Sequence, residues 1–312
     1  MENTTFKIYF HSDEKYFPSD FQYFTENSDL IVDGENLGKK TQPQLASFAC
    51  PDPTNTKNVY LNASNSIIKG NTSLDPAKIP LYYVDSEYEG LKYRTFILFY
   101  PYSGEYNLLI AKTGQHWGDI ERFTVEYDKD GKINRIYFGA HGDVDGRWVN
   151  AADLEMEDGH IVLYSAKNGH GFYPKKGMYL RIFGLANDVT NKGKSLVPTV
   201  FIPIKSILND NLEETGLAYF CGKIGKNGIS SVIYKGWLYK KEEESNPPRM
   251  INSSVYYSAV VLLAIILLLI SYKLYSFGFR KSGKDPLYVI SFILLLVLIL
   301  LYIRNIIVKS GE

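Results

Sequence analysis

The chain has 312 residues, enough for one large domain or two small ones. Its 34 basic and 34 acidic residues balance, so no basic footprint points to nucleic acid. Abundant tyrosine, phenylalanine and glycine, with only short apolar runs before residue 250, favour strands over long helices. Cys50 and Cys221 lie far apart without metal-ligand spacing. They would pair in an oxidising compartment, but reduced and partly buried thiols are favoured.

The first 240 residues are predicted to form a β-domain. Residues 5–10 have a strand pattern, and residues 33–80 are rich in Asn, Ser, Thr, Lys and Pro without sustained periodicity. This composition indicates a long surface excursion, with disorder as the alternative. Further strand patterns lie at 81–84, 94–100, 106–111, 120–127, 133–138, 161–165, 179–183 and 197–204, and a short helix is expected at 206–214. With a hairpin turn at 128–131, this spacing predicts an antiparallel β-sandwich.

Two apolar runs near the C-terminus predict a membrane anchor. Residues 255–272 and 287–303 carry no charge, and each run is long enough to cross a hydrocarbon core about 30 Å thick. Two buried core helices are the alternative, but a chain of this size could not cover two such helices on every side. The predicted order is a β-sandwich over 1–240, a charged stalk over 241–253 and a transmembrane hairpin over 254–309.

The charges around the predicted hairpin do not fix its orientation. The loop over 273–286 is basic, which would favour the cytosol, but basic residues also stand on the other side of the anchor. The first residues show neither the basic region nor the apolar region of a signal peptide. We therefore expect an integral membrane protein whose large domain faces the cytosol.

The run from His116 to Glu121 enters a predicted strand and holds the strongest candidate site. Side chains two apart in a strand share a face, so Asp119 and Glu121 are predicted to point the same way. His116 stands at the turn just before them. An imidazole and two carboxylates at the mouth of a strand suit a hard cation or acid and base chemistry.

Two further histidines could join this cluster. His141 and His170 have glycines close by on both sides, which frees the backbone to bring a side chain near a site. In the alternative, each ring hydrogen-bonds to a nearby carbonyl and caps a tight turn. Together with His116, Asp119 and Glu121, they would suit zinc, manganese or iron as well as calcium or magnesium.

Four segments, in order over about residues 7–190, resemble one known family. Residues 8–20 are similar to its opening strand and the Tyr-Leu-Pro-Ser-like stretch that follows, and residues 98–104 to its Phe-Tyr-Pro-Tyr-Asn-Gly element. Residues 116–124 are similar to its His-x-Gly-Asp-Trp-Glu-x-x-Thr strand, with Ile120 in place of Trp. Residues 164–174 resemble its Tyr-Ser-Ala-x-His-Gly-His-x-x-Tyr-Pro element, with Asn168 in place of the first His.

This family is the vacuolar protein sorting-associated protein 62 family. The family is named for a role in delivering proteins to the vacuole. The resemblance therefore implies a fold and a cellular location more than a reaction. It therefore implies a vacuolar or other endomembrane location and a role in protein sorting. The substitution at Asn168 puts any family role of that position in doubt.

A more distant likeness concerns the spacing of His116, Asp119 and Glu121. The same spacing occurs in the Gly-His-Arg-His-Asp-Trp-Glu element of the necrosis- and ethylene-inducing proteins, which are secreted β-sandwich toxins. Those toxins hold a divalent cation there and act on plant membrane sphingolipids. The likeness implies that these three residues are cation ligands, with Glu105 as a further one. The chain lacks the full heptapeptide, so the toxin function is not carried over.

Three functions fit these observations. The favoured one is a membrane-tethered binding or sorting module with an aromatic surface formed by Tyr100, Tyr102, Trp117 and Tyr173, beside Glu105. Its ligand would be a glycan, a lipid head group or a peptide. The alternatives are a metal-dependent hydrolase and a structural membrane or envelope protein with a vestigial site. The sequence contains no nucleophile elbow, P-loop or dinucleotide fingerprint, so enzymatic activity is not favoured.

Overall fold

The computed structural model describes residues 5–41, 44–45, 58–107, 112–140, 146–181, 186–204, 220, 222–228 and 250–282. The chain forms two compact units. The larger contains Met1–Tyr106, Gly114–Lys176 and Asp188–Pro248, and the smaller contains Asn107–Thr113, Gly177–Asn187 and Arg249–Glu312. The predicted helix over 206–214, most of the predicted stalk, Cys50, Cys221 and His141 lie outside the described residues. The predicted domain boundaries therefore stay predictions.

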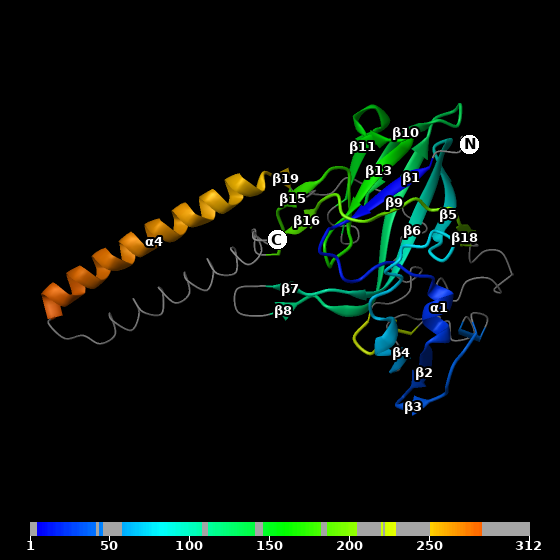
Figure 1. Ribbon diagram of the computed structural model, residues 1–312, viewed down its shortest axis with the longest axis horizontal. Helices are drawn as coiled ribbons and strands as arrows, with labels where there is room; N and C mark the ends of the chain where they lie inside the picture. The colour runs from blue at the N-terminus through cyan, green and yellow to red at the C-terminus, as the bar shows by residue number, and fades with distance from the viewer. Residues whose placement is uncertain are drawn as a thin grey trace. The chain divides into compact units, whose positions relative to one another are not determined.

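A six-stranded sheet lies at the centre of the larger unit, in the order β11-β10-β9-β6-β5-β18. Its strands are β5 (Leu81–Tyr88), β6 (Leu91–Ser103), β9 (His116–Tyr127), β10 (Ile133–Phe138), β11 (Arg147–Asn150) and β18 (Phe201–Pro203). Neighbouring strands are antiparallel except that β18 runs parallel to β5. Figure 1 shows β6 and β9 as long strands that run through this unit.

A second sheet packs on one face of the first. It orders β12 (Met156–Glu157), β13 (His160–Ser165), β1 (Phe6–Phe10) and β17 (Ser195–Leu196), and β14 (Phe172–Tyr173) also pairs with β13. Between the sheets, the Phe6 ring centroid lies 5.1 Å from that of Phe96 and 4.9 Å from that of Phe123. The predicted mainly β fold with antiparallel strands is thus confirmed, with parallel pairing added where β1 meets β13.

The opposite face of the large sheet is covered by a smaller group of elements, which lies near one end of β6 and β9 (Figure 1). These are α1 (Phe21–Glu26), β2 (Ser28–Val32), β3 (Glu35–Asn36), β4 (Val59–Ala63) and the 3-10 turn η1 (Asn65–Ile67). The rings of Phe21 and Phe24 pack edge-on against Phe99, with centroids 5.1 and 5.3 Å away. The large sheet is therefore buried on both faces at this end.

The segment predicted as a surface excursion, residues 33–80, contributes to the hydrophobic core on this face of the large sheet. Strand β4 pairs with β2, and Leu61 and Ile67 are buried. The sequence pattern missed this strand because only one of its five side chains is fully buried, which leaves no alternation to detect. Its polar residues lie on the exposed side of a short strand rather than in an unstructured loop.

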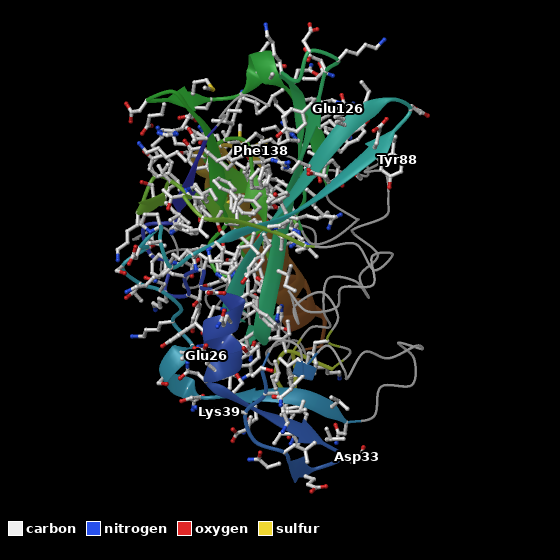
Figure 2. The ribbon with its side chains drawn as sticks, turned by 90° about the vertical axis from the view of Figure 1, so that its right-hand side faces the viewer. Glu26, Asp33, Lys39, Tyr88, Glu126 and Phe138 are labelled. Atoms are coloured by element: carbon white, nitrogen blue, oxygen red, sulfur yellow. The ribbon has the colours of Figure 1, made fainter. Side chains whose placement is uncertain are left out.

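Tight turns join the long strands where the sequence favours them. Glu89 and Gly90 both have positive φ between β5 and β6, as a two-residue hairpin requires, and Figure 2 places Tyr88 at its tip. The predicted turn at 128–131 joins β9 to β10 and is closed by a bond from the Gly131 N–H to the Asp128 carbonyl. Figure 2 also shows Phe138, the last residue of β10, in the packed interior.

Four further short elements belong to the described chain. They are β7 (Tyr106–Asn107), β8 (Lys112–Thr113), η2 (Ala151–Asp153) and β16 (Asp188–Thr190). In the smaller unit, β15 (Gly177–Tyr179) pairs antiparallel with β19 (Met250–Ile251). The helix α4 (Ser253–Ser282) follows and covers the first predicted membrane span.

Apolar side chains of α4 are exposed at Val255, Val261, Leu262, Leu263, Ile265, Ile266, Leu269, Ile270 and Tyr272. Among the residues that the structure describes, no helix is both long and apolar enough to cross a membrane. The second predicted span, residues 287–303, lies outside the described residues. The transmembrane hairpin therefore stays a prediction.

Candidate functional site

The two carboxylates predicted to share a face do so. Asp119 pairs with Tyr100 and Glu121 pairs with Leu98 in the register between β9 and β6. This alternation continues through Phe123 into the core between the two sheets, and both carboxylates are buried. The strand therefore directs two acidic side chains inward, where each needs a partner.

Gly118 separates this buried pair from the residues before it. Its φ of 65° interrupts the regular alternation of the strand. Trp117 therefore packs with the core that lies under α1, β2 and β4, instead of sharing the inward face of Asp119. A Cβ at Gly118 would lie 2.3 Å from Cγ2 of Ile224, so the position leaves no room for a side chain. The ring of His116 turns back on its own strand, with Nδ1 2.7 Å from the Gly118 carbonyl oxygen.

His170 is the partner of Asp119 and of another buried carboxylate, Glu14. Its Nδ1 donates to Oδ2 of Asp119 at 2.9 Å, and its Nε2 lies 3.7 Å from Oε1 of Glu14. The imidazole is fully buried and stacks on the ring of Tyr100, with centroids 3.8 Å apart and an interplanar angle of 3°. We call Glu14, Asp119 and His170 the buried ion group.

The charges in the buried ion group support each other. Burial alone would lower the pKa of His170, but the carboxylates of Glu14 and Asp119 outweigh it and raise this pKa to about 10. Burial likewise opposes ionisation of Glu14, yet the His170 cation and two backbone donors hold its pKa below the usual value. Glu14 accepts from the N–H groups of Lys15, Tyr16 and Asn168, at 2.8, 2.9 and 2.7 Å. A pKa raised in this way favours the imidazolium form of His170, between the two carboxylates.

Asn168 connects the buried ion group to the end of β6. It has a φ of 66°, which asparagine tolerates better than most residues, and its backbone N–H donates to Glu14. Its side-chain amide donates to the Glu105 carbonyl at 2.8 Å, and its own carbonyl accepts from the N–H of Gly104 at 2.9 Å. Asn168 thus holds two chain segments together at the position where the family pattern has a histidine.

The predicted metal ligands have other partners in this arrangement. Among the described residues, no three or more His, Cys, Asp and Glu side chains form a group that could hold a metal ion. His116 contacts its own strand, and Asp119 already faces the His170 imidazolium. With His141 outside the described residues, the cation site stays a prediction.

The predicted aromatic surface separates into buried and accessible members. Tyr100 is fully buried, and Tyr173 is buried with its hydroxyl donating to Asp188. Neither ring is therefore available at the surface. Tyr102 and Trp117 are half-buried and lie edge to face, with centroids 5.5 Å apart.

Tyr16, which the sequence patterns did not single out, joins these two rings. Its centroid lies 4.9 Å from that of Tyr102. We call Tyr16, Tyr102 and Trp117 the aromatic corner. Burial, together with the nearby groups Tyr16 and Glu105, raises the pKa of Tyr102. Glu105 therefore lies close enough to act electrostatically on the corner.

The residues missed by sequence reasoning share a cause. Glu14 is not among the residues that the sequence patterns single out as a site. Its distant partners Asn168 and His170 lie about 155 positions away in the chain, and no local spacing can indicate such contacts. The one available signal was that Glu14, Asp119 and His170 fall in three different segments that resemble the same family.

Comparisons with known proteins agree with that resemblance. A family model described as vacuolar protein sorting-associated protein 62 matches residues 1–200. No curated protein matches the chain.

Similar solved structures include "Toxin fold as basis for microbial attack and plant defense", with 13% identity and a TM-score of 0.31 over 52% of this chain and 66% of that one. Necrosis and Ethylene inducing Protein 2, from the causal agent of cocoa's Witches Broom disease, has 18% identity and a TM-score of 0.29 over 63% and 80%. NLPPya in complex with glucosamine has 12% identity and a TM-score of 0.30 over 77% and 91%. These scores are too low to support a functional argument. The family match covers most of the chain, and the chain belongs to the vacuolar protein sorting-associated protein 62 family.

Proposed function

We propose that the chain is a membrane-anchored binding module that recognises a ligand at the aromatic corner and serves protein sorting in an endomembrane or vacuolar membrane. The observation that carries this proposal is the set of three partly accessible rings over a fixed, charged base. Aromatic rings with a few fixed polar groups are common in sites that bind small ligands. Membership of the vacuolar protein sorting family supports the sorting role.

The base of the corner is well suited to hold a binding surface in place. Glu14 accepts from the backbone of Tyr16 through one oxygen and from the backbone of Asn168 through the other. Asn168 in turn holds the carbonyl of Glu105. Because these bonds fix the backbone on both sides of the corner, a ligand would bind with little loss of conformational entropy.

We place the membrane anchor at the two apolar runs of the sequence. Residues 255–272 carry no charge, and α4 exposes apolar side chains along much of its described length. Moving apolar surface from water into an apolar environment is favourable by about 25 cal/mol per Å². Insertion of these exposed side chains into lipid would therefore be favourable. Residues 287–303 would form the second span, with the β-domain on the cytosolic side.

Binding is tested with the full chain in polyoxyethylene-ether micelles, which contain neither sugar nor choline. We would screen immobilised oligosaccharides, lipid head groups and peptides against wild type, Trp117→Ala and Tyr102→Ala. Tyr23→Ala is the matched control, because Tyr23 is an exposed ring on α1 outside the corner. A ligand retained by wild type and the control but lost by both corner variants supports the proposal. No ligand, or equal binding by all four proteins, contradicts it.

Anchoring is tested separately by extraction of membranes at alkaline pH. A chain held by two spans stays in the membrane pellet, whereas release of the whole chain into the soluble fraction would contradict the anchor. Replacing Leu263 and Ile266 with lysine should weaken retention, because lysine at the centre of a span costs about 2.5–3.5 kcal/mol per residue. Lysine at Ser254, near the helix start, is the matched control.

A further inference from the structure

We propose that residues 222–228, which we call the basic turn, form an anion site that takes a phosphate group. The segment reads Gly-Lys-Ile-Gly-Lys-Asn-Gly. The inference goes beyond the proposed function, because it concerns residues outside the aromatic corner. It follows from the packing of the turn, from its two unpaired cations and from the donors of its backbone.

The basic turn is packed against the larger unit at both sides of Lys223. The Lys223 N–H donates to the Val59 carbonyl at 2.9 Å, and the Lys223 carbonyl accepts from the N–H of Leu61 at 2.9 Å. Ile224 is fully buried in the core that covers this face of the large sheet. Figure 1 shows the turn in yellow beside β4. The fold therefore fixes the backbone that carries the lysines.

Two glycines let the basic turn approach Trp117 closely. A Cβ at Gly225 would overlap Cβ of Trp117, and the φ of Gly225 is 95°. A Cβ at Gly228 would lie 2.7 Å from the Trp117 carbonyl oxygen. At either position a side chain would force the backbone to move. The turn thus lies against the start of β9 in a conformation that is set before a ligand binds, which lowers the entropic cost of binding.

The basic turn carries two cations and no acid. Lys223 and Lys226 are both exposed. Among the contacts that involve described residues, neither ammonium group forms an ion pair or a hydrogen bond. Two like charges three positions apart, with no counter-charge in the segment, repel each other and disfavour the compact state. An anion bound by both lysines would relieve this repulsion.

A second turn with two lysines differs in both respects. Between β9 and β10, Lys129 and Lys132 have the same spacing and are also exposed. Asp128 and Asp130 alternate with them, so the charges offset. A Cβ at Gly131 would meet nothing within 4 Å, so this turn stands in water. Of the two turns, only the basic turn combines unopposed lysines with a backbone packed against its neighbours.

Backbone donors lie at the tip of the basic turn. The Gly228 N–H donates to the Gly225 carbonyl at 2.9 Å, which closes the turn around Lys226 and Asn227. Within the described part of the chain, the N–H groups of these two central residues have no acceptor. Successive N–H groups in a turn form a small concave surface that binds anions. The exposed side-chain amide of Asn227 is a further donor.

This set of donors favours phosphate over other anions. Lysine binds phosphate as a point charge, whereas a carboxylate is matched best by the planar fork of arginine, which the turn lacks. The phosphates of nucleic acid are not favoured, because the whole chain has equal numbers of acidic and basic residues. The ligand is therefore a phosphate ester, either of a lipid head group or of a small soluble molecule.

Titration calorimetry of the full chain in polyoxyethylene-ether micelles tests the site. Dihexanoyl-phosphatidic acid carries a phosphate monoester, and dihexanoyl-phosphatidylcholine is the matched lipid without net charge. We expect the first to bind at least about tenfold more tightly, which is the ratio that two exposed ion pairs can supply. Its affinity should fall as salt is raised, because exposed charges are screened. Equal binding of the two lipids would overturn the inference.

Variants assign the binding to the basic turn. Lys223→Gln and Lys226→Gln should each weaken binding of phosphatidic acid up to about fivefold, and the double variant at least about tenfold. Lys226→Arg keeps the charge and should keep the affinity.

The double variant Lys129→Gln with Lys132→Gln is the matched control, because it removes two exposed charges of the same spacing at the other turn. It should leave the affinity unchanged. Equal losses in the two double variants would show an effect of net charge alone and contradict the site. All four lysines are exposed, so these substitutions leave the core intact.

Glycerol 3-phosphate distinguishes the source of the phosphate, since it carries the same monoester without acyl chains. Tighter binding of phosphatidic acid supports a lipid head group, and equal binding of the two supports a soluble phosphate ester. In either case the double lysine variant of the basic turn must lose the binding, or the inference fails. The ligand screen with Tyr102→Ala tests the aromatic corner separately, so one proposal can fail while the other stands.

Discussion

Among the networks of cations and carboxylates in the larger unit, two differ mainly in their access to water. In the buried ion group, His170 is fully buried and its two carboxylates are nearly so. On the outer side of the second sheet, Glu157 accepts from Lys7 and Lys192, whose side chains are 16% and 36% exposed. The chemistry is the same, but only the first network lacks water to replace a lost partner.

Comparing the two networks shows in which surroundings a shifted pKa contributes to the stability of the fold. Hydrogen bonds from Lys192 and Lys7 lower the pKa of Glu157 to about 2, yet solvent and salt screen these partners. His170 has no such screening, so its partners alone decide whether its charge is tolerated. We therefore expect large effects from the buried ion group and small ones from the outer network.

The largest effect should come from His170→Ala. This change leaves Glu14 and Asp119 buried without the cation between them and opens a cavity against Tyr100. Breaking a buried ion pair by removing one partner typically costs about 3–5 kcal/mol. Urea unfolding of the full chain measures the loss, and His116→Ala is the control, because His116 is only half-buried. If both variants lose the same free energy, the buried ion group is not the stabilising feature.

A second strong effect should come from Gly118→Ala. The residue has a φ of 65°, and its Cβ would lie 2.3 Å from Ile224. We expect a loss of about 2–4 kcal/mol in unfolding free energy, with a changed near-UV circular dichroism signal from Trp117. Gly131→Ala is a matched control with φ of 79° and nothing within 4 Å, so it carries the backbone cost without the clash. Equal losses would mean that no clash occurs at Gly118.

The pH dependence of stability should carry the signature of the buried ion group. The folded-state pKa of His170 is about 10, above its ordinary value of 6.5, so its contribution is complete below about pH 6.5 and is lost as pH rises toward 10. The pKa of Glu14 is lowered, so its contribution is complete above its ordinary value of 4.5 and is lost as pH falls below it. The contribution is therefore greatest between about pH 4.5 and 6.5.

Comparing wild type with His170→Gln isolates this signature. Glutamine cannot take a proton, so the difference in unfolding free energy between the two proteins should shrink from pH 6.5 to pH 10. Chemical denaturation at several pH values measures it. A difference that stays constant over this range would mean that His170 is not charged in the folded chain.

Local patterns predicted the strands better than the contacts between them. Strand β10 begins and ends at the residues predicted, because its apolar alternation follows a strong turn at 128–131. The shared face of Asp119 and Glu121 follows from the same period of two. By contrast, β4 has one buried residue in a polar segment, and no pattern could reveal it.

In the candidate site too, local patterns predicted some features, whereas contacts between distant segments could not be predicted. Sequence placed Tyr102 and Trp117 in a recognition surface, and both are accessible at the corner. It placed Tyr100 there as well, although Tyr100 is on the inward face of β6 and stacks on His170. The pairing of His170 with Glu14 depends on packing of distant segments, so only the folded chain reveals it.

The smallest effect should come from Glu157→Gln in the outer network. Lys7, Lys192 and the hydroxyl of Tyr9 all donate to this carboxylate, but each can turn to water when the charge is removed. The Tyr9 ring also keeps its stacking on Tyr164, with centroids 5.8 Å apart, whatever the charge at residue 157. We therefore expect no measurable change in the urea midpoint at physiological salt, and at most a small decrease at low salt. A loss as large as that of His170→Ala would show that access to water does not explain the difference between the two networks.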